Sequence, residues 1–316
     1  MKKYSAAIIG CGNVAGMYGS NANKNIQSHA QAYQENERTL LKAIYDPDRD
    51  RLKAFSKKWG VDDAFTSLEE MIESQRIDVI SICSPTQRHF EHFEFTSAKN
   101  ITAIFAEKPL SDDLDEAKKI VEMTKDMTVA VNYFRRWNKD LQKIKLNIDG
   151  NSYGDIKKVI VHYTKGIKNN GTHILDLLFW FFGKLNLEQV FKKYTSIDND
   201  IGVDCLLSAS KDIPIIFSHV PDVDYVYIEI EILSESGVLK INQRGQSITV
   251  FSIEKDPDYS VFNRLIKDNE CDTRWKKCFE GAVGNIISNI ESGEKLLCTP
   301  EDALITSILA EEIIQN

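Results

Sequence analysis

Short apolar runs alternate with longer, charged segments of helical pattern through the first third of the chain, and this alternation constrains the fold more than any other feature. Buried strands that alternate with helices form βαβ units, whose strands lie parallel in one sheet. The pattern therefore predicts an α/β domain with a doubly wound parallel sheet. The apolar runs that we interpret as strands are Ala6–Ile9, Leu40–Tyr45, Val79–Cys83, Ile101–Ala106 and Thr128–Val131.

The first run leads into GCGNVAG, in which Gly10, Gly12 and Ala15 form a GxGxxA pattern. The first glycine permits a tight turn, the second lets a pyrophosphate approach the backbone, and a small third residue lets helix and strand pack closely. The pattern alone is weak evidence. Here it follows a predicted strand and is expected to open a helix, which is the context the motif requires. It predicts dinucleotide binding by a Rossmann domain.

Asp46 ends the second predicted strand, where a carboxylate can accept hydrogen bonds from the adenine ribose and favour NAD(H) over NADP(H). Its distance from Gly12 exceeds the usual spacing of about 20 residues. We therefore interpret MYGSNANKNIQSHAQAYQENERTL as a first helix preceded by an insertion. The alternative is that Asp46 only supports a helix cap at Asp48. Arg49 and Arg51 are close enough in sequence to weaken the preference for NAD(H), so NADP is possible.

Two later strands end in polar residues, at the edge where open parallel sheets bind ligands. Ser84 and Pro85 form a sharp turn that suits contact with a nucleotide. Glu107 and Lys108 follow a buried run, and Pro109 prevents the strand from continuing. A lysine at such a position is rarely structural.

The second half contains further runs rich in β-branched and aromatic residues, which predict strands. Between two of them, NNGTHILDLLFW predicts an apolar helix that carries His173 and Asp176 on one face. The alternative is a satisfied core histidine beside an exposed or first-turn carboxylate. The predicted strand segments are DIKKVIVHYT, VDCLLSAS, IPIIFSHV, YVYIEIEIL and QSITVFSI.

Composition excludes several classes of protein. A chain of 316 residues suggests two domains, and a net charge of −8 argues against nucleic-acid binding. No stretch approaches the roughly 20 apolar residues of a membrane span, so no membrane partner is expected. The N-terminal apolar run breaks at Gly10, too early for a signal peptide. Dispersed cysteines without CxxC pairs favour reduced thiols in a cytoplasmic enzyme, and no metal site is expected.

The motifs together resemble the Gfo/Idh/MocA dehydrogenases, the family of glucose-fructose oxidoreductase, inositol dehydrogenase and rhizopine catabolism enzymes. The resemblance spans nearly the whole chain, and the order and spacing of its motifs are specific. It implies a dinucleotide-binding Rossmann domain at 1–131, and an α/β domain with an open, mostly antiparallel sheet for substrate binding and oligomerisation at 132–316. A homodimer or homotetramer is expected. The motifs are GCGNVAG, SPTQRH, EKPL, GTHILD and IESGEKLLCTPEDAL.

The resemblance also implies residue roles. His173 is the acid/base that exchanges a proton with the substrate hydroxyl, and Lys108 orients that hydroxyl and stabilises negative charge. Asp176 either binds a neighbouring hydroxyl or orients His173, and Arg136 lines the substrate cleft, although ordinary packing explains it equally well. The expected coenzyme-binding residues are Gly10, Gly12, Asn13, Val14, Asp46, Ser84, Pro85, His89, Glu107 and Lys108.

One position departs from the family. Many members carry an aspartate four residues before the histidine, where this chain has Asn169, which can bind a sugar hydroxyl but cannot exchange a proton.

The expected function is hydride transfer between NAD and a sugar CH–OH carbon. A catalytically silent regulator that binds NAD(H) or a sugar is the alternative. His29, His89 and His92 are interpreted as mostly structural, although His89 lies in the cofactor-turn motif of the family.

A nucleotide-linked sugar is placed slightly ahead of a free sugar or cyclitol as the substrate. Lys165 and Lys168 precede the histidine helix, and a helix start at Thr172 would offer free N–H groups to a diphosphate. The alternative is that both lysines only keep a surface strand soluble.

Overall fold

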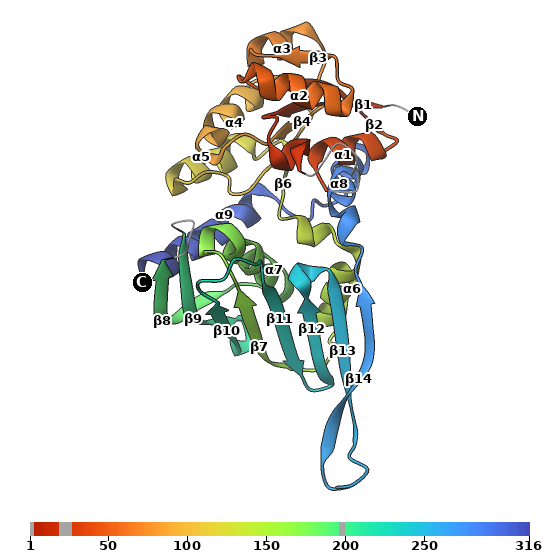
Figure 1. The fold of residues 1–316 in the computed structure, drawn as a ribbon, viewed down its shortest axis with the longest axis vertical. Helices are drawn as coiled ribbons and strands as arrows, with labels where there is room; N and C mark the ends of the chain where they lie inside the picture. Colours follow the sequence, from red (N-terminus) through yellow and green to blue (C-terminus); the bar gives the residue numbers. More distant parts are fainter. Residues whose placement is uncertain (1–2, 19–26, 196–199) are drawn as a thin grey trace. The chain divides into compact units, whose positions relative to one another are not determined.

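The computed structural model describes residues 3–18, 27–195 and 200–316, which form two compact units (Figure 1). The first unit comprises Met1–Trp137 and Lys276–Leu304, and the second comprises Asn138–Trp275 and Ile305–Asn316. The boundary expected from the sequence, between residues 131 and 132, falls inside the first of these units. The late segment Lys276–Leu304 also belongs to the first unit, and no sequence pattern indicated that the chain returns to it.

The first unit contains a six-stranded parallel sheet with the order β3-β2-β1-β4-β5-β6. This order reverses between β1 and β4, so the predicted doubly wound Rossmann sheet is confirmed. Five strands match the apolar runs, and the sixth, β3, is a short edge strand outside them. The strands are β1 (Tyr4–Ile9), β2 (Thr39–Tyr45), β3 (Asp63–Phe65), β4 (Val79–Ile82), β5 (Ala103–Ala106) and β6 (Thr128–Val131).

Four helices of the first unit, α1, α2, α3 and α5, begin at side-chain caps. The side chains of Ser28, Asp48, Ser67 and Asp113 each accept a hydrogen bond from a backbone N–H in the first helical turn. Asp48 thus caps the helix after β2, as the sequence suggested. The helices are α1 (His29–Glu35), α2 (Arg49–Trp59), α3 (Leu68–Ser74), α4 (His89–Ser97), α5 (Leu114–Thr124) and α8 (Cys278–Ser292).

The GxGxxA motif opens only a short turn, Asn13–Met17, instead of a full helix. The insertion predicted before the first helix falls largely on residues 19–26, outside the described residues. The helix itself, α1, begins at His29.

The second unit contains an eight-stranded sheet with the order β14-β13-β12-β11-β7-β10-β9-β8. Only β7 and β10 pair in parallel; the other pairs are antiparallel, so the predicted open, mostly antiparallel sheet is confirmed. The strands are β7 (Ile156–Tyr163), β8 (Asn186–Thr195), β9 (Ile201–Ala209), β10 (Ile213–His219), β11 (Ile228–Ser234), β12 (Gly237–Asn242), β13 (Ser247–Lys255) and β14 (Asn263–Asp272).

Helices α6 (Lys139–Asp149) and α7 (Thr172–Phe182) contribute to one core with the sheet. Leu177, Leu178 and Phe181 of α7 are buried in this core. The last helix, α9 (Pro300–Gln315), runs from the first unit into the second and adds Leu309 and Ile313 to the same core. None of the helices in the described ranges combines the length and apolar character needed to cross a bilayer.

Candidate active site

The loops that carry the predicted coenzyme residues are tied together at one edge of the Rossmann sheet. Each loop follows the carboxyl end of a parallel strand, and backbone N–H groups link it to the neighbouring strand. Gly10 donates to Tyr45 O at 2.8 Å, Cys83 to Ile9 O at 2.8 Å, and Glu107 to Ile82 O at 2.9 Å. These bonds bring the loops after β1, β2, β4 and β5 to one edge, as the sequence predicted.

The glycine turn is tightly packed at its first glycine and open at its second. Gly10 has φ +89°, and a Cβ there would lie 2.7 Å from Ser84 N, so the turn requires glycine. A Cβ at Gly12 would meet nothing within 4 Å. Packing of the described chain therefore does not explain the second glycine, whereas close approach of a pyrophosphate does. Exposed Asn13 and half-buried Val14 follow it.

Asp46 points its carboxylate back toward this turn. Its Oδ2 accepts from Cys11 N–H at 2.8 Å and its Oδ1 from Asp48 N–H at 2.9 Å, and Arg51 Nη1 lies 3.4 Å from Oδ2. The side chain is only 1% exposed, whereas Arg51 is 48% exposed. The carboxylate thus fixes the glycine turn, and Arg51 supplies the exposed charge beside it.

Two histidines support the loop after β4. The His92 ring lies 2.8 Å from Ser84 Oγ, and burial, together with Arg88 and His89, lowers the pKa of His92 to about 4. The His89 ring bridges Ser84 O at 3.0 Å and Pro109 O at 2.8 Å. His89 is buried, so its part in this edge is to join the Ser84–Pro85 loop to the Lys108–Pro109 loop.

Glu107 and Lys108 are half-buried where β5 ends, and the peptide bond after Lys108 is cis. Burial alone raises the pKa of the Glu107 carboxyl, but hydrogen bonds from His29 and Asn132, and the charge of Lys108, lower it below its ordinary value. Glu107 is therefore a carboxylate anion beside Lys108. Sequence reasoning set His29 aside, because its sequence position does not reveal a contact with a residue so far along the chain.

Arg136 is buried at 2% exposure, and its Nη1 donates to Leu297 O at 2.9 Å and pairs with Asp302 at 3.0 Å. These internal contacts match the packing alternative. Substrate binding by Arg136 stays a prediction.

The second unit carries the histidine helix, and its entry differs from the sequence expectation. A turn of π-helix, Ile167–Gly171, precedes α7, and Thr172 N–H donates to Ile167 O. The Asp200 carboxylate accepts from Asn169 N–H at 2.8 Å and Lys168 N–H at 3.2 Å. The expectation that the helix start at Thr172 offers free N–H groups to an anion was wrong, because a backbone carbonyl occupies the Thr172 N–H.

Asp200 also explains the shape of this entry segment. A Cβ at Gly166 would lie 2.0 Å from Asp200 Cγ, so only glycine lets the two segments approach this closely. Lys168 Nζ lies 3.8 Å from Glu311, which partly neutralises it. No sequence signal marked Asp200, because it is brought here by the strand pairing of the second unit.

The predicted substrate residues lie around this entry segment. Asn169 is exposed, and His173 and Lys165 are half-buried. Asp176 is 0% exposed, so the alternative of an exposed carboxylate was wrong. A fully buried carboxylate suits the orientation of a neighbouring group better than direct contact with a substrate.

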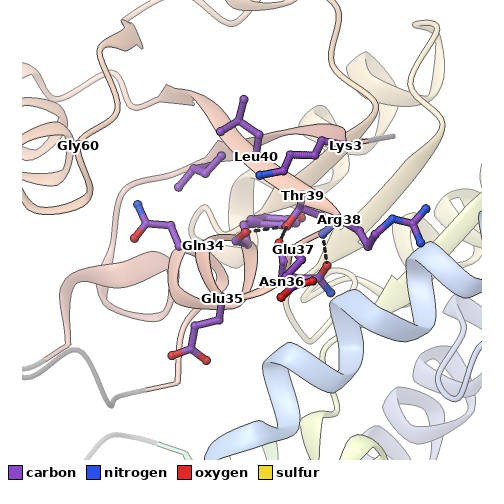
Figure 2. Close-up of a pocket in the computed structure, with 11 residues that line it drawn as sticks. Lys3, Gln34, Glu35, Asn36, Glu37, Arg38, Thr39, Leu40 and Gly60 are labelled. Carbon is purple, nitrogen blue, oxygen red and sulfur yellow. Dashed lines mark hydrogen bonds between the residues drawn. The ribbon is translucent and has the colours of Figure 1, made fainter. Parts of the chain in front are cut away.

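A hollow of about 670 Å³ lies elsewhere on the first unit, around the turn between α1 and β2 (Figure 2). Lys3, Arg38 and Thr39 line it, at the amino ends of β1 and β2. Strand carboxyl ends bind the ligands of open parallel sheets, so this hollow is not the coenzyme site.

Known proteins match this architecture. Residues 4–134 match the Gfo/Idh/MocA family, described as an oxidoreductase family with an NAD-binding Rossmann fold. Myo-inositol 2-dehydrogenase of Thermotoga maritima is 31% identical over 128 residues, which cover 40% of this chain and 38% of that protein. The chain thus aligns with well under half the length of this curated relative.

Solved structures extend the likeness in fold to the whole chain. A 3-ketoreductase from Actinomadura kijaniata, in complex with TDP-benzene and NADP, superposes with a TM-score of 0.78 at 17% identity and covers 99% of this chain and 98% of its own. An oxidoreductase from Agrobacterium radiobacter, in complex with NAD⁺, L-tartaric acid and magnesium, gives 0.74 at 18% identity over 99% and 96%.

The first unit thus has an NAD-binding Rossmann fold, and the second unit adds an open-sheet α/β fold. Residues 4–134 are similar to the Gfo/Idh/MocA oxidoreductases, in agreement with the resemblance seen in the sequence.

Proposed function

We propose that the protein is an NAD(P)-dependent dehydrogenase or ketoreductase that acts on a CH–OH carbon of a sugar or cyclitol. The observation that carries the proposal is the strand-end edge of the first unit, where the open Gly12 turn, Asp46 and the Glu107–Lys108 pair follow β1, β2 and β5. The bound nicotinamide supplies or accepts the hydride.

The residues of the chain handle the proton and the charge. In the oxidising direction, His173 takes the hydroxyl proton as the carbonyl forms, and Lys108 donates a hydrogen bond to the oxygen on which negative charge develops. Asp176, buried one helical turn from His173, orients the imidazole. Asn169 binds a neighbouring hydroxyl. The proposal requires His173 and Lys108 to face the same substrate carbon.

An uncharged polyhydroxylated ring is the substrate we favour, which reverses the order that the sequence suggested. Asp200 places a carboxylate on the N–H groups of Lys168 and Asn169, and Glu311 lies beside Lys168. A diphosphate at this position would meet both carboxylates and be repelled. The inositol dehydrogenase among the relatives supports a cyclitol.

A nucleotide-linked sugar is the second candidate, because half-buried Lys165 remains beside the site and the 3-ketoreductase neighbour was solved with TDP-benzene. The variant Lys165→Ala separates the two substrates. It should raise KM for a nucleotide sugar, less so at high salt, and leave KM for a cyclitol unchanged.

The test is NADH formation from NAD⁺ with a panel of cyclitols, free sugars and nucleotide sugars. Lys108→Met and His173→Ala should each lower turnover by at least about two orders of magnitude, the scale of a positioned proton-transfer group. His173→Ala should also leave the NADH dissociation constant within about twofold of the parent. Normal turnover by both variants would show that the site is misplaced. Tight NADH binding without turnover on any substrate would favour the regulator.

A further inference from the structure

A line of buried polar side chains crosses the first unit and ends at Glu107. Tyr33 Oη lies 2.8 Å from Ser81 Oγ, which lies 2.8 Å from His29 Nδ1. His29 Nε2 lies 2.9 Å from Glu107 Oε1, and Asn132 Nδ2 donates to the same oxygen at 2.6 Å. The mechanism above uses none of Tyr33, Ser81, His29 and Asn132.

The hydrogen-bonding capacity of each group determines which atom donates and which accepts along this line. Glu107 Oε1 already accepts from Asn132, and an ionised carboxylate only accepts, so His29 Nε2 carries the proton. In the neutral imidazole, Nδ1 then has a lone pair and accepts from the Ser81 hydroxyl. Ser81 Oγ in turn accepts from Tyr33, and burial raises the pKa of Tyr33, so that its phenol keeps its proton.

Packing fixes the His29 ring in this position. The side chain is 0% exposed, and the ring centroid lies 4.3 Å from that of Phe105 and 5.4 Å from that of Phe279. His29 is also the first residue of α1, directly after the Ser28 cap. The ring therefore cannot swing away from Glu107 without disturbing the core.

Glu107 connects this line to Lys108, the next residue. Its side chain is 13% exposed, and the charge of Lys108 contributes to its lowered pKa. Because this attraction is mutual, a carboxylate held in place favours the ammonium form of Lys108. Cys83 also faces Glu107, but burial raises the pKa of its thiol well above its usual range, so it adds no charge.

We propose that His29 is a positioning residue for Lys108, because it holds the Glu107 carboxylate through Nε2–H and so keeps Lys108 oriented and protonated. The consequence for turnover rests on the proposed function. The effect on the ionisation of Lys108 does not rest on the proposed function.

His29→Leu removes the Nε2–H donor and fills the buried position with an apolar side chain. His29→Gln keeps an amide that can donate to Glu107. Ser81→Ala is a smaller change that removes only the donor to Nδ1, and it serves if His29→Leu fails to fold. His162→Leu, on an exposed position of β7, is the control for the substitution itself.

The first measurement follows the titration of Lys108 by NMR of ¹³Cε-labelled lysine, assigned with Lys108→Arg. In His29→Leu, or in Ser81→Ala if that variant must replace it, Lys108 should lose its proton at a pH lower by at least about half a unit, and His29→Gln should restore the parent value. Nitrogen shifts of the parent should place the His29 proton on Nε2. An unshifted Lys108 in a folded variant, or a proton on Nδ1, would overturn the proposal.

Turnover is measured on the same proteins. His29→Leu should lower kcat by about tenfold or more and shift the basic limb of the pH profile downward, with the NADH dissociation constant unchanged. If the role of His29 is purely structural, His29→Leu will lower the melting temperature and leave kcat and the basic limb of the pH profile unchanged. If the parent turns over no substrate but the Lys108 shift persists, the proposed function fails and this inference stands.

Discussion

We expect coenzyme choice to depend on Arg51. Asp46 is covered and fully engaged by backbone N–H groups, whereas the Arg51 guanidinium lies exposed beside it. A carboxylate at this position repels a 2′-phosphate, and an arginine attracts it. We expect the parent to bind NADH more tightly than NADPH by a modest margin, and Arg51→Ala to widen that margin several-fold. Fluorescence titration measures both constants, and equal or tighter NADPH binding by the parent would show that Asp46 does not select NAD.

His92 predicts how stability depends on pH. Its pKa is about 4 in the folded protein and about 6.5 in an unfolded chain. Between these values only the unfolded chain binds the proton, so stability falls as the pH drops from about 6.5 to 4, by at most about 3 kcal/mol. Urea unfolding across this range should show the loss in the parent and a flatter dependence in His92→Asn. A slope in His92→Asn as steep as in the parent, or an equal flattening in the surface variant His162→Asn, would contradict this reading.

At the scale of single elements, the entry to α7 explains the departure at Asn169. The Asn169 N–H already binds the Asp200 carboxylate at 2.8 Å, so an aspartate at 169 would place two carboxylates close together. Asn169→Asp should therefore lower the melting temperature by a few degrees, about 1 kcal/mol in a unit of this size, and reduce turnover at pH 7. Adding Asp200→Asn should recover both. A gain in activity from Asn169→Asp alone would instead indicate a site that has drifted from catalysis.

The helices and strands differ in how well the sequence predicts them. The apolar parallel strands were predictable because both faces are buried, and so was α7, whose apolar face is continuous. β8 and β14 were missed because they are edge strands with mostly exposed, charged residues, such as Lys192 and Glu270. β12, a short strand that begins at Gly237, was also not among the predicted strands. Lys108 and His173 were found through motifs, whereas Asp200 and His29 act through tertiary contacts that no local pattern records.

At the scale of the whole molecule, each unit has its own core, and α8 joins the first core although it follows the second sheet in the chain. Hydrophobic pattern shows that α8 has a buried face but cannot say which sheet receives it. Assembly into the predicted homo-oligomer requires a contact surface that is exposed in the single chain.

The hairpin of β13 and β14 is the clearest such surface (Figure 1). Residues 253–255 pair only with 263–265, beyond the end of β12, and Val261 and Phe262 near the tip are 80% and 63% exposed. A two-stranded ribbon with an apolar tip is marginal alone in water. We therefore expect a dimer or tetramer by light scattering, and a dissociation constant at least about tenfold weaker in Phe262→Ser. A monomeric parent at micromolar concentration would contradict the expectation.

Hydride transfer is the central claim, and isotope transfer tests it most directly. The protein is incubated with NAD⁺ and carbon-deuterated cyclitols and sugars, and the nicotinamide coenzyme is analysed by mass spectrometry. We predict one deuterium on the reduced coenzyme with the parent and a rate at least about a hundredfold lower with His173→Ala or Lys108→Met. Reduced coenzyme without deuterium, or no transfer from any of these substrates, would contradict the account.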